Sequence, residues 1–132
     1  MNDFKRMSDE KLAIYIIDYI RRTDKLMQIV SDYMEGKTDR SATDFIHAEY
    51  RDLKLSIKDD AHYINLSENR AHSESLYNTY FVPSISEASA EGFSAPTNST
   101  INSKMFSSLY DAHYKLTKYY SLKDWENIAY HD

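Results

Sequence analysis

The sequence predicts an all-α fold, a compact bundle of four to five helices with a long Ser/Asn-rich loop. Only two glycines and two prolines occur among 132 residues, whereas β-hairpins and phosphate-binding loops depend on glycine at positive φ. Apolar side chains recur at the spacing of one helix face along most of the chain. At this length we expect one domain, residues 1–132, with a single core.

The first helix is predicted to run from Ser8 to Gly36. Ser8 is a typical N-cap residue, and the acids Asp9 and Glu10 suit the positive end of the helix dipole. Gly36 is expected just beyond the last turn, where a left-handed residue often ends a helix. The apolar stripe between these ends consists of Leu12, Ile16, Tyr19, Ile20, Thr23, Leu26, Met27, Val30, Tyr33 and Met34.

A second helix is predicted after the polar turn at 37–40. Ser41-Ala-Thr-Asp44 is similar to a capping box, with aspartate in place of glutamate at its fourth position. We expect the helix to end between Leu66 and Arg70. One side of it carries Phe45, Ile46, Tyr50, Leu53, Ile57, Ala61 and Ile64.

The loop is expected over residues 84–103. Residues 73–81 are predicted to form a short third helix or the tail of the second. Pro83 should stop this helix, because proline has no N–H and restricts the residue before it. Ten of the twenty residues 84–103 are Ser, Thr or Asn, and their side chains compete for backbone hydrogen bonds. A loop of this length in a small domain is usually functional or disordered.

Two further helices are predicted at the C-terminal end. Residues 105–120 repeat the apolar helical spacing. His113 lies on the apolar face of this helix, where we expect a core histidine with a hydrogen-bonded ring. Ser121 and Asp124 then introduce a short terminal helix that contains Trp125.

The net charge of −5 lies entirely in residues 59–103. That segment has six acids and one base, Arg70, whereas the rest of the chain balances fifteen acids with fifteen bases. The negative electrostatic field of such a segment attracts basic surfaces and repels nucleic acid and anionic lipid. We therefore expect a basic protein as partner, with no direct binding of nucleic acid or membrane.

Twelve tyrosines are many for a core of this size. Exposed tyrosines are favoured at protein interfaces, because they bring contact area at little cost in side-chain entropy. The alternative is that most of these rings line helix packing. The predicted partner-binding residues are the six acids of the segment and its two tyrosines: Asp59, Asp60, Glu68, Glu74, Tyr77, Tyr80, Glu87 and Glu91.

Two Asp-x-x-His pairs, Asp44/His47 and Asp59/His62, leave a second function open. Their spacing places a carboxylate beside an imidazole on a helix, as in metal-binding bundles. The pairs lie about 22 Å apart on one helix at 1.5 Å per residue, so they cannot share a metal. A metal protein or bundle enzyme is therefore an alternative, although ordinary surface contacts explain the pairs more simply.

No other motif identifies a reaction or a cofactor. Cysteine is absent, and neither a Gly-x-Ser-x-Gly elbow nor a glycine-rich phosphate loop occurs. The expectation is a non-enzymatic protein without cofactor or metal. We place it in the cytoplasm, because the apolar run 12–17 is too short to span a bilayer and the N-terminus lacks a signal-peptide pattern.

A resemblance to a known family lies in residues 26–54, which read LMQIVSDYMEGKTDRSATDFIHAEYRDLK. The segment resembles the N-terminal signature of immunity proteins of the colicin D type, which recurs in contact-dependent growth inhibition systems. There a helix ends in an aromatic or apolar pair and a small turn, and the next helix opens with an acid and Phe. Here those elements are 33–37 and Asp44-Phe45, followed by Tyr50 and Arg51.

The resemblance implies a helical cytosolic protein that covers the cationic active site of a cognate nuclease toxin, often a tRNase. The charge of the chain agrees with this function independently, because a nuclease binds phosphates through Lys and Arg. Its inhibitor offers carboxylates in their place and gains association rates of ~10⁸ M⁻¹s⁻¹ through electrostatic steering. A DNA mimic encoded by a phage or plasmid is a further alternative, but the acids are too few and too unevenly spaced for one.

Overall fold

The computed structural model describes residues 4–66, 75–91 and 100–131. The ordered elements within these ranges are all helical, so the prediction of an all-α fold is confirmed. In chain order they are η1 (Phe4–Arg6), α1 (Asp9–Met34), α2 (Ala42–Leu66), the π-helix η2 (Tyr77–Phe81), α3 (Val82–Glu91), α4 (Ser103–Thr117) and α5 (Leu122–Ala129).

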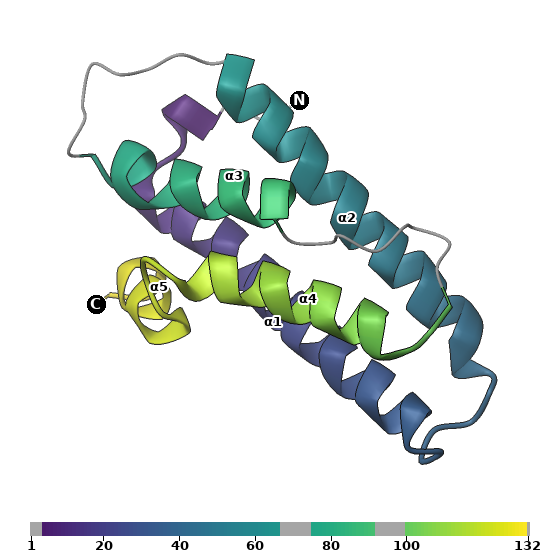
Figure 1. Cartoon of the computed structure of the whole chain (residues 1–132). Helices are drawn as coiled ribbons and strands as arrows, with labels where there is room; N and C mark the ends of the chain where they lie inside the picture. The colour runs from purple at the N-terminus through teal and green to yellow at the C-terminus, as the bar shows by residue number, and fades with distance from the viewer. Residues whose placement is uncertain (1–3, 67–74, 92–99, 132) are drawn as a thin grey trace.

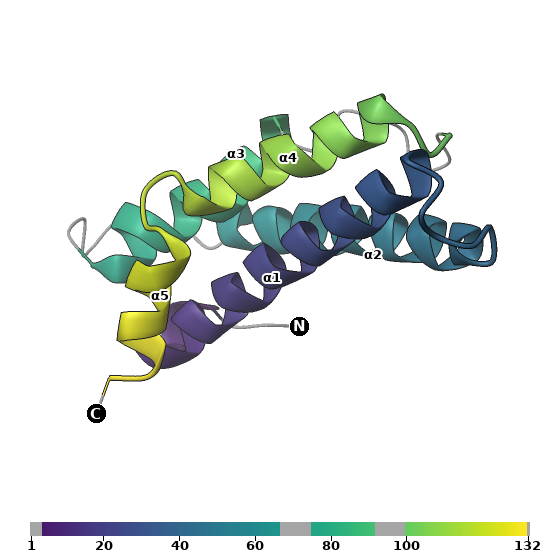
Figure 2. The same ribbon diagram turned by 90° about the horizontal axis from the view of Figure 1, so that it is seen from below.

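The four helices α1 to α4 form a closed bundle. Each helix contacts its two neighbours in the order α1, α2, α3, α4, and α4 returns to α1 (Figure 1). Helices α1 and α2 run antiparallel, and α5 lies across the N-terminal half of α1 (Figure 2). In the described ranges, no helix combines the length and the apolar character needed to cross a bilayer.

Helix α1 begins and ends where the sequence predicts. The Ser8 side chain accepts a hydrogen bond from the Lys11 amide at 3.3 Å, as an N-cap does. At the other end Gly36 has φ +74°, its amide donates to the Tyr33 carbonyl, and the Lys37 amide donates to the Asp32 carbonyl. These two bonds make a Schellman motif, which turns the chain towards α2.

The core is built from one apolar face of each helix. Helix α2 buries its predicted apolar face with one exception, Phe45, which is 49% exposed. Neighbouring residues of a helix point about 100° apart, so the side chain of Phe45 points away from the core that buries Ile46. Polar contacts join the helices within the core. Tyr50 donates to Ser108 at 2.9 Å, and the His113 ring nitrogen Nδ1 lies 3.1 Å from the Thr23 hydroxyl oxygen.

The prediction of a loop over 84–103 is wrong for residues 84–91, which form most of α3. The π-helix η2 runs directly into α3, and the Val82 amide bonds to the carbonyl of Tyr77 five residues back. Pro83 therefore stands in the first turn of α3, where a missing N–H is tolerated. Burial of Ile85 and Ala88 against the bundle outweighs the weak helix propensity of the serines. Residues 92–99 lie outside the described ranges.

The terminal helix α5 begins where the sequence predicts. Ser121 and Asp124 form a reciprocal capping box at its start. Trp125 is fully buried, and its ring meets Tyr120 edge-on at 5.1 Å between centroids. Arg21 of α1 binds Glu126 at 2.7 Å, so α5 is held to α1 by an ion pair as well as by apolar packing.

Replacing Gly36 tests the turn between α1 and α2. We expect Gly36→Ala to lower the free energy of unfolding by about 1–2 kcal/mol, because a β-carbon disfavours the left-handed conformation. No atom lies within 4 Å of the position of that β-carbon, so the loss comes from the backbone alone. Urea denaturation measures it, with Gly36→Asn as the control that should lose less. Equal stability of Gly36→Ala and the parent would contradict the turn geometry.

Candidate functional site

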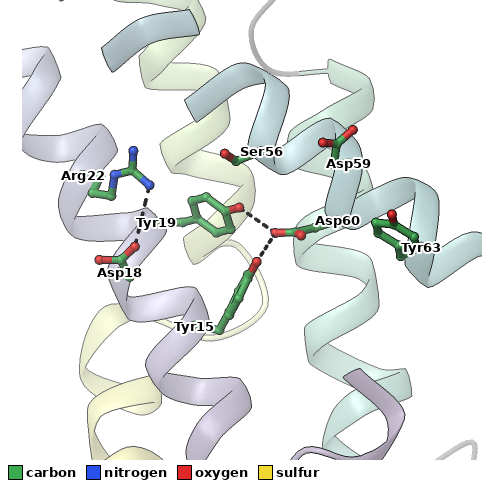
Figure 3. Close-up of a pocket in the computed structure, with 8 residues that line it drawn as sticks. All are labelled: Tyr15, Asp18, Tyr19, Arg22, Ser56, Asp59, Asp60 and Tyr63. Atoms are coloured by element: carbon green, nitrogen blue, oxygen red, sulfur yellow. Dashed lines mark hydrogen bonds and ion pairs between the residues drawn. The ribbon is translucent and has the colours of Figure 1, made fainter. Parts of the chain in front are cut away.

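A pocket of about 380 Å³ opens between α1 and α2 (Figure 3). Its walls combine acidic, aromatic and hydroxyl side chains with one arginine. Helix α1 contributes four of the lining residues and α2 contributes the other four. They are Tyr15, Asp18, Tyr19, Arg22, Ser56, Asp59, Asp60 and Tyr63.

The two walls of the pocket have the same spacing in sequence. On α1 the lining positions are i, i+3, i+4 and i+7 counted from Tyr15, and on α2 they have the same offsets counted from Ser56. Residues so spaced share one face of a helix. Because α1 and α2 pack as antiparallel neighbours, these two polar edges face each other across the pocket.

Asp60 is the centre of the pocket. Its side chain accepts hydrogen bonds from the hydroxyls of Tyr15 at 2.6 Å and Tyr19 at 2.5 Å, and both bonds end on the same oxygen, Oδ2. The residue is only 5% exposed. Burial raises the pKa of Asp60 and outweighs the two hydrogen bonds, which lower it. Burial and the bond to Asp60 likewise raise the pKa of Tyr19, so its hydroxyl remains a donor.

Arg22 is the cation in the pocket wall, but its charge is engaged elsewhere. Its Nη2 atom lies 2.7 Å from a Glu49 oxygen and 2.6 Å from an Asp52 oxygen, and Nη1 lies 3.8 Å from Asp18. Partial burial lowers the pKa of Arg22, but the bonds to Glu49 and Asp52 raise it above the ordinary value. The guanidinium therefore stays charged and joins α1 to α2 beside the pocket.

Two of the predicted partner-binding acids belong to this pocket, and they differ in environment. Asp59 is exposed at the pocket wall, as an acid that meets a partner should be. Asp60 was predicted as another such acid, but it is buried and bound by two tyrosines of its own chain. Adjacent residues on a helix point about 100° apart, which explains the difference.

Two further predicted residues that the structure describes, Glu87 and Tyr77, do not extend the acidic surface. Glu87 accepts hydrogen bonds from Lys118, at 3.0 Å, and from Tyr119. Burial raises the pKa of Glu87, but the hydrogen bonds from Tyr119 and Lys118 together outweigh burial and hold the pKa below its ordinary value. Tyr77 is 8% exposed and stacks on Phe81, so it is a core residue.

Tyr80 is half-buried, and its ring stacks on Tyr120 with centroids 3.8 Å apart. It therefore also serves helix packing, which was the alternative explanation for the tyrosines. Glu68, Glu74 and the side chain of Glu91 lie outside the described residues. The predicted patch over residues 59–91 is thus not assembled by those of its members that the structure describes.

Sequence reasoning missed the α1 half of the pocket. The site prediction was based on the net charge of residues 59–103, and the α1 residues lie outside that segment. They are Tyr15, Asp18, Tyr19 and Arg22. The available signal was the repeated i, i+3, i+4, i+7 spacing of polar and tyrosine positions beside an apolar stripe. That spacing alone does not show that the two edges face each other.

The two Asp-x-x-His pairs do not form part of a larger ligand set. Within 4–66, 75–91 and 100–131, no group of three or more His, Cys, Asp or Glu side chains is placed to hold a metal ion. The His62 ring lies near Tyr63, with 6.1 Å between centroids. No specific observation therefore favours the metal-binding alternative.

Comparison with known proteins adds no relative. No protein-family model, no curated protein and no solved structure matches the chain. The resemblance to immunity proteins of the colicin D type therefore stays a prediction. The geometry of the pocket and the charge of the chain carry the functional argument.

Neutralising Asp60 tests its burial. Asp60→Asn keeps an oxygen that accepts from Tyr15 and Tyr19 but removes the charge. A raised folded-state pKa means that the wild type loses stability as pH rises from about 4, the ordinary pKa of aspartate, through that folded-state value. We expect the stability of Asp60→Asn relative to wild type to improve between about pH 4 and pH 7.

Urea denaturation at several pH values measures this difference. Asp60→Ala is the matched control, because it also removes the charge and should follow the same pH dependence relative to wild type. It leaves the buried Tyr19 hydroxyl without its acceptor, so it should be about 1–3 kcal/mol less stable than Asp60→Asn at every pH. A difference between Asp60→Asn and wild type that does not change with pH would show that Asp60 ionises as readily in the fold as in water.

Proposed function

We propose that this protein is an immunity protein, which binds the basic active site of a cognate bacterial nuclease toxin and occludes it. The observation that carries the proposal is the pocket between α1 and α2, where the carboxylates of Asp18, Asp59 and Asp60 gather beside tyrosines. Carboxylates and tyrosines together are the side chains expected to meet a surface rich in lysine and arginine. The docking surface is therefore assigned to the α1–α2 pocket rather than to the whole segment 59–91.

The charge of the whole chain supports the same function. A net charge of −5 draws a cationic toxin towards the protein over distances of about a Debye length, about 8 Å at physiological ionic strength. Asp18 and Asp59 are exposed at the pocket, so they act during this approach. The half-buried tyrosines Tyr15 and Tyr63 become anchors once water leaves the interface.

Inhibition in this proposal is steric and electrostatic. The protein performs no reaction and needs no cofactor, because covering the phosphate-binding residues of a nuclease is sufficient to stop catalysis. The encounter takes place in the cytoplasm, where a nuclease toxin finds its RNA. The resemblance of residues 26–54 to colicin D-type immunity proteins supports this assignment and includes Arg22's partners Glu49 and Asp52.

A growth assay tests the function directly. We expect expression of this chain to restore growth of bacteria that produce the product of the gene next to it, and we expect the two purified proteins to form a complex. A neighbouring product that is not toxic, or a toxicity that this chain leaves unchanged, would contradict the proposal.

Charge reversal at the pocket tests the docking surface. The double variant Asp18→Lys/Asp59→Lys should associate with the toxin at least about tenfold more slowly and with a weaker dependence on salt, because steering is lost. The matched control is Asp24→Lys/Asp111→Lys, which makes the same change in net charge at exposed positions outside the pocket. Stopped-flow measurements at several salt concentrations compare them, and equal rates for both variants would place the docking surface elsewhere.

A further inference from the structure

The buried carboxylate of Asp60 has no cation beside it in the described part of the chain. Both groups that bind it, the hydroxyls of Tyr15 and Tyr19, are neutral. Arg22 shares the pocket, but it is bound to Glu49, Asp52 and Asp18. Buried charges in proteins are normally paired. Among the described residues, no cation therefore neutralises an ionised Asp60.

One oxygen of this carboxylate is left for a ligand. Both tyrosines bond Oδ2, and within residues 4–66, 75–91 and 100–131 no hydrogen bond or ion pair reaches Oδ1. A carboxylate has about four acceptor positions, so two hydrogen bonds on one oxygen leave it well short of saturation. Asp60 is 95% buried and lines the pocket, so a ligand in the pocket is the group expected to reach the unused oxygen.

The rest of the pocket suits a planar cation. Tyr15 and Tyr63 supply aromatic rings from opposite helices (Figure 3), and a guanidinium group stacks on such rings. Asp59 and Asp18 add negative charge on either side. The volume of about 380 Å³ is large enough to hold one side chain.

We propose that the pocket between α1 and α2 receives the guanidinium group of one arginine of the toxin, with Asp60 Oδ1 as its acceptor. The inference rests on the proposed function and names one contact at the centre of its interface. The inserted arginine supplies the counter-charge for Asp60. Asp59 stabilises the same group from the pocket wall, and the tyrosine rings cover its faces.

A titration with ethylguanidinium followed by NMR tests the pocket without the toxin. We expect saturable shifts of backbone amides confined to 15–22 and 56–63, the segments that line the pocket. Ethylurea has nearly the same shape without the charge and should give no saturable shift. Spermidine represents a free polyamine, and tighter binding of spermidine than of ethylguanidinium would contradict an arginine side chain as the occupant.

Variants decide whether Asp60 is the acceptor. Asp60→Asn should weaken ethylguanidinium binding at least about tenfold, which equals about 1.4 kcal/mol, while the same spectrum shows that the fold is kept. Asp111→Asn makes the same change in net charge on the exposed surface of α4 and should bind like the wild type. Unchanged affinity in Asp60→Asn, or an equal loss in both variants, would overturn the inference.

Toxin binding separates this inference from the proposed function. If Asp60→Asn neutralises the toxin as well as wild type does, the inserted arginine is wrong while the immunity function stands. If ethylguanidinium binds as expected but the neighbouring gene product is neither toxic nor bound, the proposed function fails, and the arginine of a toxin fails with it.

Discussion

The hydrogen bonds from Tyr15 and Tyr19 to Asp60 join α1 to α2, and the character of the pocket depends on them. Asp60 is a buried ionisable side chain at the edge of a core that is mostly apolar. The hydrogen bonds to Asp60 connect the two helices and hold this ionisable group in a mostly buried position. Burial of that charge is unfavourable, as the raised pKa of Asp60 shows. In the proposed complex a cation enters the pocket and relieves this cost, which would link binding and stability at one residue.

Packing in the bundle holds the hydrogen-bonded residues Tyr15, Tyr19 and Asp60 in place. Helix α1 is continuous over 26 residues and contacts α2, α4 and α5, so the positions of Tyr15 and Tyr19 are fixed from several sides. Phe4 of η1 packs edge-on against Tyr15, with centroids 5.1 Å apart, and reinforces its orientation. Beside the pocket, Arg22 holds Glu49 and Asp52 of α2, which fixes the register of the two helices. The pocket is thus preorganised, which lowers the entropy that binding costs.

The sequence predicted the elements well where local signals and tertiary packing agree. Ser8, Gly36 and the Ser121/Asp124 box mark helix ends through bonds that involve only neighbouring residues, so they were readable in advance. Helix α3 was not, because its serines and Pro83 indicate a loop, and only the burial of Ile85 and Ala88 by other helices makes it a helix. For the site, Asp59 and Asp60 were identified by charge. Asp59 is exposed and Asp60 is buried against two tyrosines of α1. Both facts depend on how α1 packs on α2, and no local sequence pattern predicts that packing.

Hydrogen–deuterium exchange of the toxin complex tests whether the α1–α2 pocket is the centre of the surface that meets a cationic partner. We expect the slowing of exchange on binding to be greatest in segments 15–22 and 56–63. Slowed exchange confined to α4 and α5, with both pocket segments unchanged, would contradict it.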